Sequence, residues 1–353
     1  MKNDKYLFMP SFSLDPSRVV SYNSVFIRDY ENQKLNTFSE VNARVNKLFK
    51  GYQSASLVVR SSHNFEISNN AYRNLKRRIN WLYYLSKSKS IKTYTGKNIY
   101  NFKMSFITLT LPSVQRHCTR YINSKLLNVF LTEIRQRTKM NNYLWRLEFQ
   151  KNGNVHYHIA TDTFIDYHLL LEVWNRVLDL HGYIDAYADK FKSLTLSEYC
   201  NKIDPTNKTE FSIKAKRYAS QRAFNWRRPP SVNVQSVISN KAIANYISKY
   251  FSKNSDSVCS GNVLDNDTNS SNLRLWFCSR SLSKLNTISG FCEAVPYDIF
   301  AIVSYCKKVK KHIGKYATIT FFEMVGMPQR YRLMLEKILK TYAYGTGYVP
   351  CPA

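Results

Sequence analysis

The clearest pattern of apolar and polar positions begins at residue 105. Ile107, Leu109 and Leu111 alternate with threonines, which predicts a half-buried strand that Pro112 ends. An earlier segment, 70–86, has apolar residues at helical spacing with basic residues beside them. After the strand, helical spacing recurs at four further apolar residues: Leu127, Phe130, Leu131 and Ile134.

Two more strands, 143–150 and 155–159, are expected to form a hairpin, because apolar residues alternate in both and a polar, glycine-containing turn joins them. For both apolar faces to pack on one core, the loop must hold an odd number of residues. A three-residue loop ending at Gly153, with that glycine in a left-handed conformation, meets this requirement. Glu148 would then lie directly across from His156.

The remaining pattern predicts a helix that Asp166 caps, a strand at 231–238 and a helix at 241–252. The resulting order is strand, helix, hairpin, helix, strand, helix. This order favours an α+β fold, an antiparallel sheet flanked by helices.

The chain is expected to divide into four segments. Residues 1–101 form a partly helical N-terminal extension, and 102–254 the α+β domain. Residues 255–272 are rich in Ser, Asn and Asp and predict a linker. Residues 273–353 form a small C-terminal region, a candidate for contacts with DNA or a partner, in which the basic run 307–315 is expected to be a surface helix.

Charge narrows the class of partner. The chain has 52 Lys+Arg against 24 Asp+Glu, a formal net charge of +28 that is spread along its length. This surplus predicts a polyanionic partner, because each lysine or arginine placed on a phosphate releases condensed counterions. A membrane surface is the rival, but no apolar stretch approaches the roughly 18 residues of a membrane span and no secretory pattern is present.

The seven cysteines are scattered and include no C-x-x-C, which predicts reduced thiols in a cytoplasmic protein. The G-x-x-x-x-G-K-[ST] motif is absent as well, so the sequence contains no Walker-type helicase motor.

His156 and His158 are two residues apart on an expected strand, so both point to one face. With Glu148 across from them they would form a set of two imidazoles and one carboxylate. Such a set leaves coordination positions open for a divalent metal that polarises a phosphate, or for Fe(II) in an oxygenase. On a chain of this charge, phosphate chemistry is favoured, and a solvated hairpin end is the structural alternative.

The segment 246–253 contains Tyr-x-x-Lys twice in succession. On a helix, Tyr246 and Tyr250 lie one turn apart on the same face, and Lys249 and Lys253 project near them. Core packing is the alternative for such a pair. A tyrosine has a pKa near ~10, so attack on phosphorus at neutral pH needs help from a metal and a lysine.

Three motifs stand in one order: Phe106-Ile-Thr-Leu-Thr110, His156-Tyr-His158, and the helix 246–253. Together they resemble the replication initiators of small single-stranded DNA phages and viruses, within the His-hydrophobe-His endonuclease superfamily. The resemblance covers about 105–253.

The resemblance implies an RRM-like sheet that holds Mg²⁺ or Mn²⁺ on His156, His158 and Glu148. One of Tyr246 or Tyr250 would attack single-stranded origin DNA, leaving a 5′-phosphotyrosine link and a 3′-hydroxyl primer. The other tyrosine would act in the next round of this rolling-circle cycle. A host helicase and a host DNA polymerase would be partners, in the bacterial cytoplasm if a phage encodes the chain.

A basic and aromatic segment, 214–230, predicts a track for single-stranded DNA, since cations suit phosphates and aromatic faces suit unstacked bases. A solvated loop is the alternative. The candidate contacts are Lys214, Lys216, Arg217, Arg222, Trp226, Arg227 and Arg228.

Two other classes remain open. A two-tyrosine transposase or a plasmid initiator would use the same chemistry. A non-catalytic protein that binds single-stranded nucleic acid would carry the same charge, with incidental histidines and tyrosines.

Overall fold

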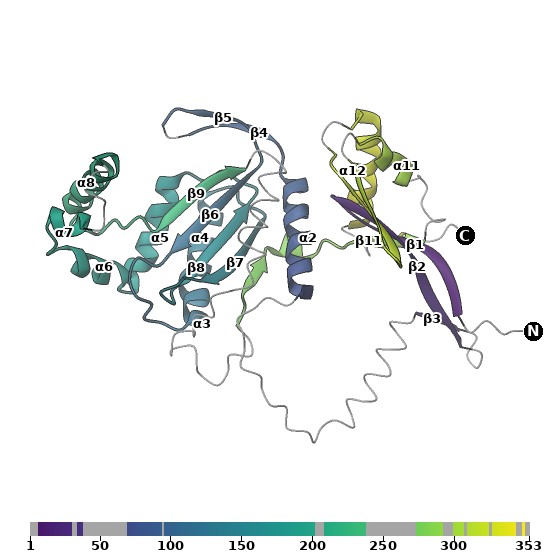
Figure 1. The fold of residues 1–353 in the computed structure, drawn as a ribbon, viewed down its shortest axis with the longest axis horizontal. Coiled ribbons are helices and arrows are strands. Elements are labelled where there is room, and N and C mark those ends of the chain that lie inside the picture. The colour runs from purple at the N-terminus through teal and green to yellow at the C-terminus, as the bar shows by residue number, and fades with distance from the viewer. Residues whose placement is uncertain are drawn as a thin grey trace, which may run out of the picture. The chain divides into compact units, whose positions relative to one another are not determined.

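The computed structural model divides the chain into two compact units (Figure 1). The larger unit is His63–Leu282, and the smaller unit combines Met1–Ser62 with Ser283–Ala353. The structure describes residues 6–29, 34–37, 69–93, 95–201, 208–237, 273–291, 299–306, 309–324, 327–343 and 348–349.

This division corrects the expected boundaries at 101 and 273. The two terminal parts of the chain join because β1 (Tyr6–Asp15) pairs with β11 (Ile288–Phe291) in one sheet. Residues 69–102 and 273–282 belong instead to the larger unit. The expected linker at 255–272 lies outside the described residues.

The larger unit contains a five-stranded antiparallel sheet in the order β10-β7-β8-β6-β9. Its strands are β6 (Met104–Thr110), β7 (Tyr143–Phe149), β8 (Val155–Thr161), β9 (Val232–Val237) and β10 (Trp276–Cys278). With the helices beside it, this sheet confirms the predicted α+β fold.

One face of this sheet is covered by helices whose apolar side chains share its core, among them Phe130, Ile134 and Trp174. Asp166 caps α5 as expected, because its side chain accepts a hydrogen bond from the backbone N–H of His168. The covering elements are α3 (Thr119–Tyr121), the π-helical stretch η1 (Ile122–Leu127), α4 (Asn128–Arg137), α5 (Tyr167–Leu180) and α6 (Tyr183–Phe191).

The larger unit is completed by elements at its borders. The helix predicted at 70–86 is α2 (Asn69–Leu85), whose Leu75, Ile79 and Leu82 are fully buried. The others are β4 (Lys89–Lys92), β5 (Asn98–Phe102), α7 (Leu196–Cys200), α8 (Lys208–Ala223) and α10 (Arg280–Ser283).

The smaller unit contains a seven-stranded sheet in the order β12-β13-β2-β1-β11-β14, with β3 also paired to β2. The basic run expected to be a helix instead forms β12, because Val309–Ile313 pairs antiparallel with Thr318–Phe322 of β13. The elements not yet named are β2 (Arg18–Asp29), β3 (Lys34–Thr37), α11 (Ile299–Ser304), β13 (Ala317–Phe322), α12 (Gln329–Ala343) and β14 (Tyr348–Val349).

Within the described part of the chain, no helix is both long enough and apolar enough to cross a membrane.

Candidate active site

The β7–β8 hairpin has the turn that its sequence predicts. Gln150 donates its backbone N–H to the carbonyl of Asn154 at 2.9 Å, which leaves a three-residue loop, 151–153. Gly153 has a φ of 79°, the left-handed conformation that glycine adopts without steric cost. The loop sets the register in which Glu148 pairs directly with His156, so the predicted placement of these two residues is confirmed.

A buried amide network holds this turn against the loop after β6. Asn154 accepts a hydrogen bond from the Gln115 backbone N–H at 2.9 Å and donates one to the Ser113 carbonyl at 2.8 Å. The Gln115 side chain accepts in turn from the Val155 backbone N–H at 2.9 Å. Asn154 and Gln115 are 2% and 3% exposed, so each bond lies out of water and fixes the start of β8.

Both histidines lie on the sheet face opposite the helices. The helix-covered face carries Tyr157 and Ile159, and side chains alternate along β8, so His156 and His158 point the other way. Their rings are 4.7 Å apart between centroids. This face is buried at the Met104 end of β6 and more open at the Thr110 end, where His156 lies.

Neighbouring strands supply partners for each imidazole. The Nδ1 atom of His156 is 3.1 Å from the Thr110 hydroxyl and 3.2 Å from the Gln150 side-chain amide. The Nε2 atom of His158 is 2.9 Å from a carboxylate oxygen of Glu148, and its Nδ1 is 3.5 Å from the Thr108 hydroxyl. Hydroxyls beside Nδ1 orient the rings so that Nε2 is the atom presented to a ligand.

Electrostatics favour a neutral His156 and an ionised Glu148. Burial, assisted by the neighbouring His158, lowers the pKa of His156 to about 4. Burial alone would raise the pKa of Glu148, but the hydrogen bond from His158 and the charges of His158 and Arg146 lower it overall. A neutral imidazole and a carboxylate are the forms that bind metals.

The donor set therefore fits a divalent metal: two imidazole nitrogens and one carboxylate, with open positions for phosphate oxygen. Among the described residues, no group of three or more His, Cys, Asp or Glu side chains is arranged as a ready-made metal site. Glu148 bonds directly to His158 instead.

Arg146 is a residue of this face that the sequence did not single out. It pairs with His158 in the register of β7 and β8 and is only 9% exposed. Its charge helps to keep Glu148 ionised. The alternation along β7 places Arg146 on the polar face, but its burial depends on packing that no local pattern encodes.

The nucleophile candidates Tyr246 and Tyr250, with Lys249 and Lys253, lie outside the described residues, as does the helix expected at 241–252.

The predicted DNA track is largely the exposed surface of α8. Lys216, Arg217 and Arg222 are exposed on this helix, and Lys214 is half-buried. Beyond it, Arg228 lies over the ring of Phe224 at 4.1 Å from the centroid, and that ring is 45% exposed.

Two residues of the expected track have different roles. Trp226 is 3% exposed and packs among Tyr187, Tyr218 and Phe191, so its ring stabilises the core and presents no face to a base. Arg227 forms ion pairs at 2.7 Å with both Asp179 and Asp185. Its charge is already neutralised within the chain.

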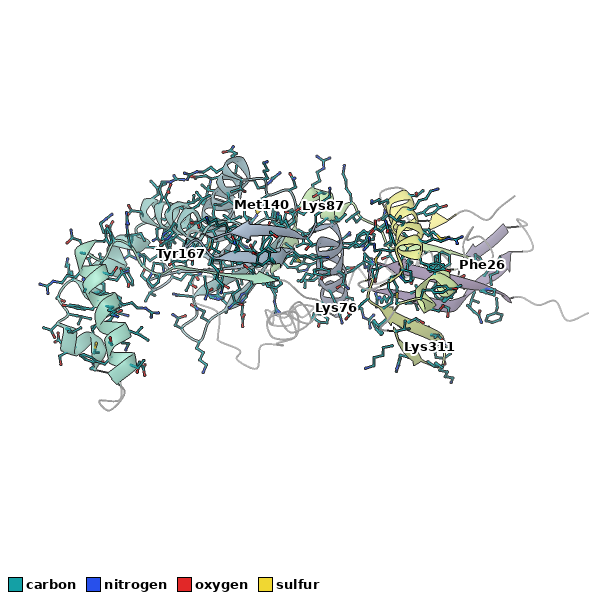
Figure 2. The ribbon with its side chains drawn as sticks, turned by 90° about the horizontal axis from the view of Figure 1, so that it is seen from above. Phe26, Lys76, Lys87, Met140, Tyr167 and Lys311 are labelled. Carbon is teal, nitrogen blue, oxygen red and sulfur yellow. The ribbon has the colours of Figure 1, made fainter. Side chains whose placement is uncertain are left out.

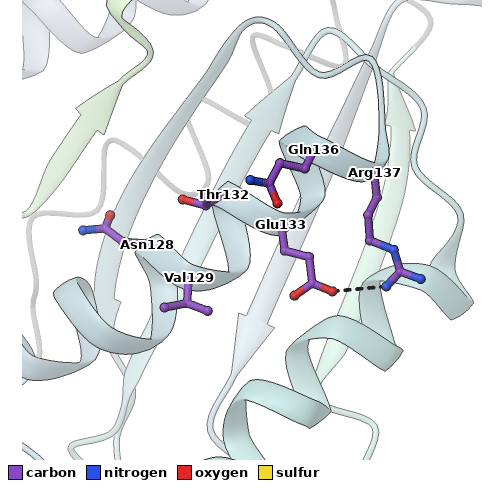
Figure 3. Close-up of a pocket in the computed structure, with 6 residues that line it drawn as sticks. All are labelled: Asn128, Val129, Thr132, Glu133, Gln136 and Arg137. Carbon is purple, nitrogen blue, oxygen red and sulfur yellow. Dashed lines mark hydrogen bonds and ion pairs between the residues drawn. The ribbon is translucent and has the colours of Figure 1, made fainter.

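A surface pocket lies elsewhere on the larger unit (Figure 3). It is lined by Asn128, Val129, Thr132, Glu133, Gln136 and Arg137, with an ion pair between Glu133 and Arg137. These residues belong to α4, which covers the face opposite the histidines, so the pocket is not part of the candidate site.

Comparison with known protein families identifies the segment that contains this site. Residues 104–255 match the model of the Replication-associated protein family, of the ORF2 type. This segment belongs to a replication initiator family. The matched residues include β6, both histidines of β8 and the two candidate tyrosines. No curated protein and no solved structure matches the chain.

Proposed function

We propose that the chain nicks and rejoins single-stranded origin DNA through a covalent tyrosine link, as a rolling-circle initiator. The observation that carries the proposal is the convergence of His156, His158 and Glu148 on the open end of one sheet face, inside a segment of a replication initiator family. When bound there, Mg²⁺ or Mn²⁺ would withdraw negative charge from a scissile phosphate.

In this proposal the protein holds the phosphate with its own charged groups. Arg146 lies beside His158 in the sheet and would attract a phosphate oxygen to the same face. The hydroxyls of Thr108 and Thr110 keep the two imidazoles oriented. The exposed cations of α8 would bind the flanking strand.

Tyr246 or Tyr250 supplies the nucleophile. The phenolic oxygen forms a bond to phosphorus, the bond from phosphorus to the 3′ oxygen breaks, and the proton that the phenol loses is balanced by one gained on that oxygen. Lys249 or Lys253 would stabilise the phenolate, whose parent phenol has a pKa near ~10. The products are a 5′-phosphotyrosine link and a 3′-hydroxyl that primes synthesis.

Chain length permits this attack. The last described residue before the tyrosines is Val237, which pairs with Met104 at the far end of β6 from Thr110. Six residues of β6 separate these two positions, about 20 Å along a strand. The nine peptide units from Val237 to Tyr246 can extend up to about 30 Å, so the phenol can reach the histidines.

Two tyrosines suit a cycle in which one cleaves the regenerated origin while the other holds the DNA end. Each transfer exchanges one phosphodiester for another and requires no ATP. Unwinding and synthesis would fall to a host helicase and a host DNA polymerase.

The test is a denaturing gel with 5′- and 3′-labelled single-stranded origin DNA and Mn²⁺. We expect cleavage by the wild type that EDTA abolishes and that His158→Ala reduces at least about a hundredfold. His168→Ala is the matched control, because His168 is exposed on α5, on the opposite side of the sheet, and its loss should leave cleavage unchanged. Binding of origin DNA without cleavage under any divalent metal would instead support the non-catalytic alternative.

A further inference from the structure

The sheet of the smaller unit has one buried and one open face. Phe12, Leu14 and Val19 are at most 1% exposed and share one face, since Leu14 pairs with both Val19 and Ile288. β11, which carries Ile288, contacts α12, so the helices cover this face. Residues that alternate with these ones point to the opposite face.

The opposite face of β12, β13 and β2 is composed of basic, aromatic and aliphatic residues in register. Directly paired residues of an antiparallel sheet lie side by side. The pairs form three adjacent rows: Lys310–Phe321–Arg18, His312–Ile319–Val20 and Ala317–Tyr22.

This face combines exposed rings with positive charge along its edge. Phe321 is 39% exposed, and Tyr22 is half-buried in the row beyond the next. Every residue of β12 is exposed, Lys310 and His312 among them. The hairpin 309–322 contains three lysines and no Asp or Glu, and Lys311 projects from it into solvent (Figure 2).

A ligand that fits such a face has flat apolar groups for the rings and regularly spaced negative charges for the lysines. Unstacked bases and their phosphates have both, whereas the bases of a duplex are already stacked on each other. The chain belongs to a replication initiator family over 104–255, so DNA is the polyanion available to it.

We infer that this open face, formed by β2, β13 and β12, binds single-stranded DNA. It is a second binding surface in the smaller unit, and it contains none of the residues proposed for nicking. Bases stack on Phe321 and Tyr22, and phosphates pass along Lys310.

Another explanation of the lysines is protection of an edge strand against pairing with a second chain. Lys310 and Lys311 are adjacent on β12, so they serve that purpose equally. They lie on opposite faces of the sheet, however, and only Lys310 shares a row with Phe321. The two variants Lys310→Ala and Lys311→Ala therefore separate the explanations.

The experiment measures the affinity of the full-length protein for a labelled single strand of about 40 nucleotides by fluorescence anisotropy, over a range of salt concentrations. Phe321→Leu, which keeps apolar bulk but removes the aromatic face, should weaken binding about five- to tenfold. Lys310→Ala should reduce the slope of log affinity against log salt by about 0.7. Lys311→Ala should have a clearly smaller effect.

Photocrosslinking locates the contact. A strand containing 5-iodouracil should crosslink to the tryptic peptides 316–330 or 19–28, which contain Phe321 and Tyr22. Equal effects of the two lysine variants, or crosslinks confined to the larger unit, would overturn the inference. Cleavage of a short origin oligonucleotide by Phe321→Leu should match the wild type, so a failure of nicking and a failure of this surface are distinguished.

Discussion

Asn154 should be a main determinant of stability at the end of the sheet that carries His156. The change Asn154→Ala removes one acceptor and one donor from a site that is 2% exposed. The backbone N–H of Gln115 and the carbonyl of Ser113 then lose their partners. An unsatisfied buried polar group costs about 1–3 kcal/mol, so we expect a loss of roughly 2–4 kcal/mol in the free energy of unfolding.

Tryptophan fluorescence during urea unfolding measures this loss in the relevant unit alone. All five tryptophans of the chain lie in the larger unit, at positions 81, 145, 174, 226 and 276. Asn152→Ala is the matched control. Asn152 is exposed in the same turn and accepts one local bond from the Asn154 backbone N–H, so its loss should cost about 0.5 kcal/mol.

A loss below about 1 kcal/mol for Asn154→Ala, or equal losses for the two variants, would refute the reasoning about this turn. If the reasoning holds, the Asn154 variant should also bind Mn²⁺ more weakly than the Asn152 variant. The turn sets the register between Glu148 and His156, on which the proposed donor set depends.

Three further outcomes are expected. Glu148→Gln should weaken Mn²⁺ binding at least about tenfold by calorimetry, because an amide is a poorer ligand than a carboxylate; unchanged affinity would remove Glu148 from the site. Burial raises the pKa of Tyr187 to about 12, above an unfolded value near ~10, so stability is complete below pH ~10 and falls as pH rises toward 12. Thermal unfolding of Tyr187→Phe should lack that part of the alkaline loss, and an identical pH profile would contradict it. Lys216→Ala should flatten the salt dependence of single-strand binding more than Arg227→Ala, whose guanidinium is already paired with two carboxylates; the reverse order would contradict the assignment of the track.

The sheet and the hairpin could be predicted from sequence because their determinants are local. The apolar alternation of β6, β7 and β8 and the parity of one glycine turn together fix which residues oppose which. This reasoning places Glu148 across from His156, as the register confirms. It does not give the direct bond from Glu148 to His158 or the burial of Arg146, which depend on how side chains pack across strands.

The smaller unit could not be predicted because its sheet joins residues at opposite ends of the chain. No local pattern connects β1 with β11, and the lysine-rich run at β12 has no alternation strong enough to identify a strand. Trp226 was misjudged for a related reason: a sequence of mixed cations and aromatics does not say which rings are buried, and the cluster around Trp226 forms only in three dimensions.

The most direct test of the central claim is the mass of the peptide linked to DNA after reaction of the wild type with single-stranded origin DNA and Mn²⁺. The two candidate nucleophiles fall on different tryptic peptides, Tyr246 on 242–249 and Tyr250 on 250–253. The account predicts a 5′-phosphodiester adduct on one or both of these peptides, and no adduct in the Tyr246→Phe, Tyr250→Phe double variant. An adduct on any other residue, or cleavage that continues in the double variant, would contradict it.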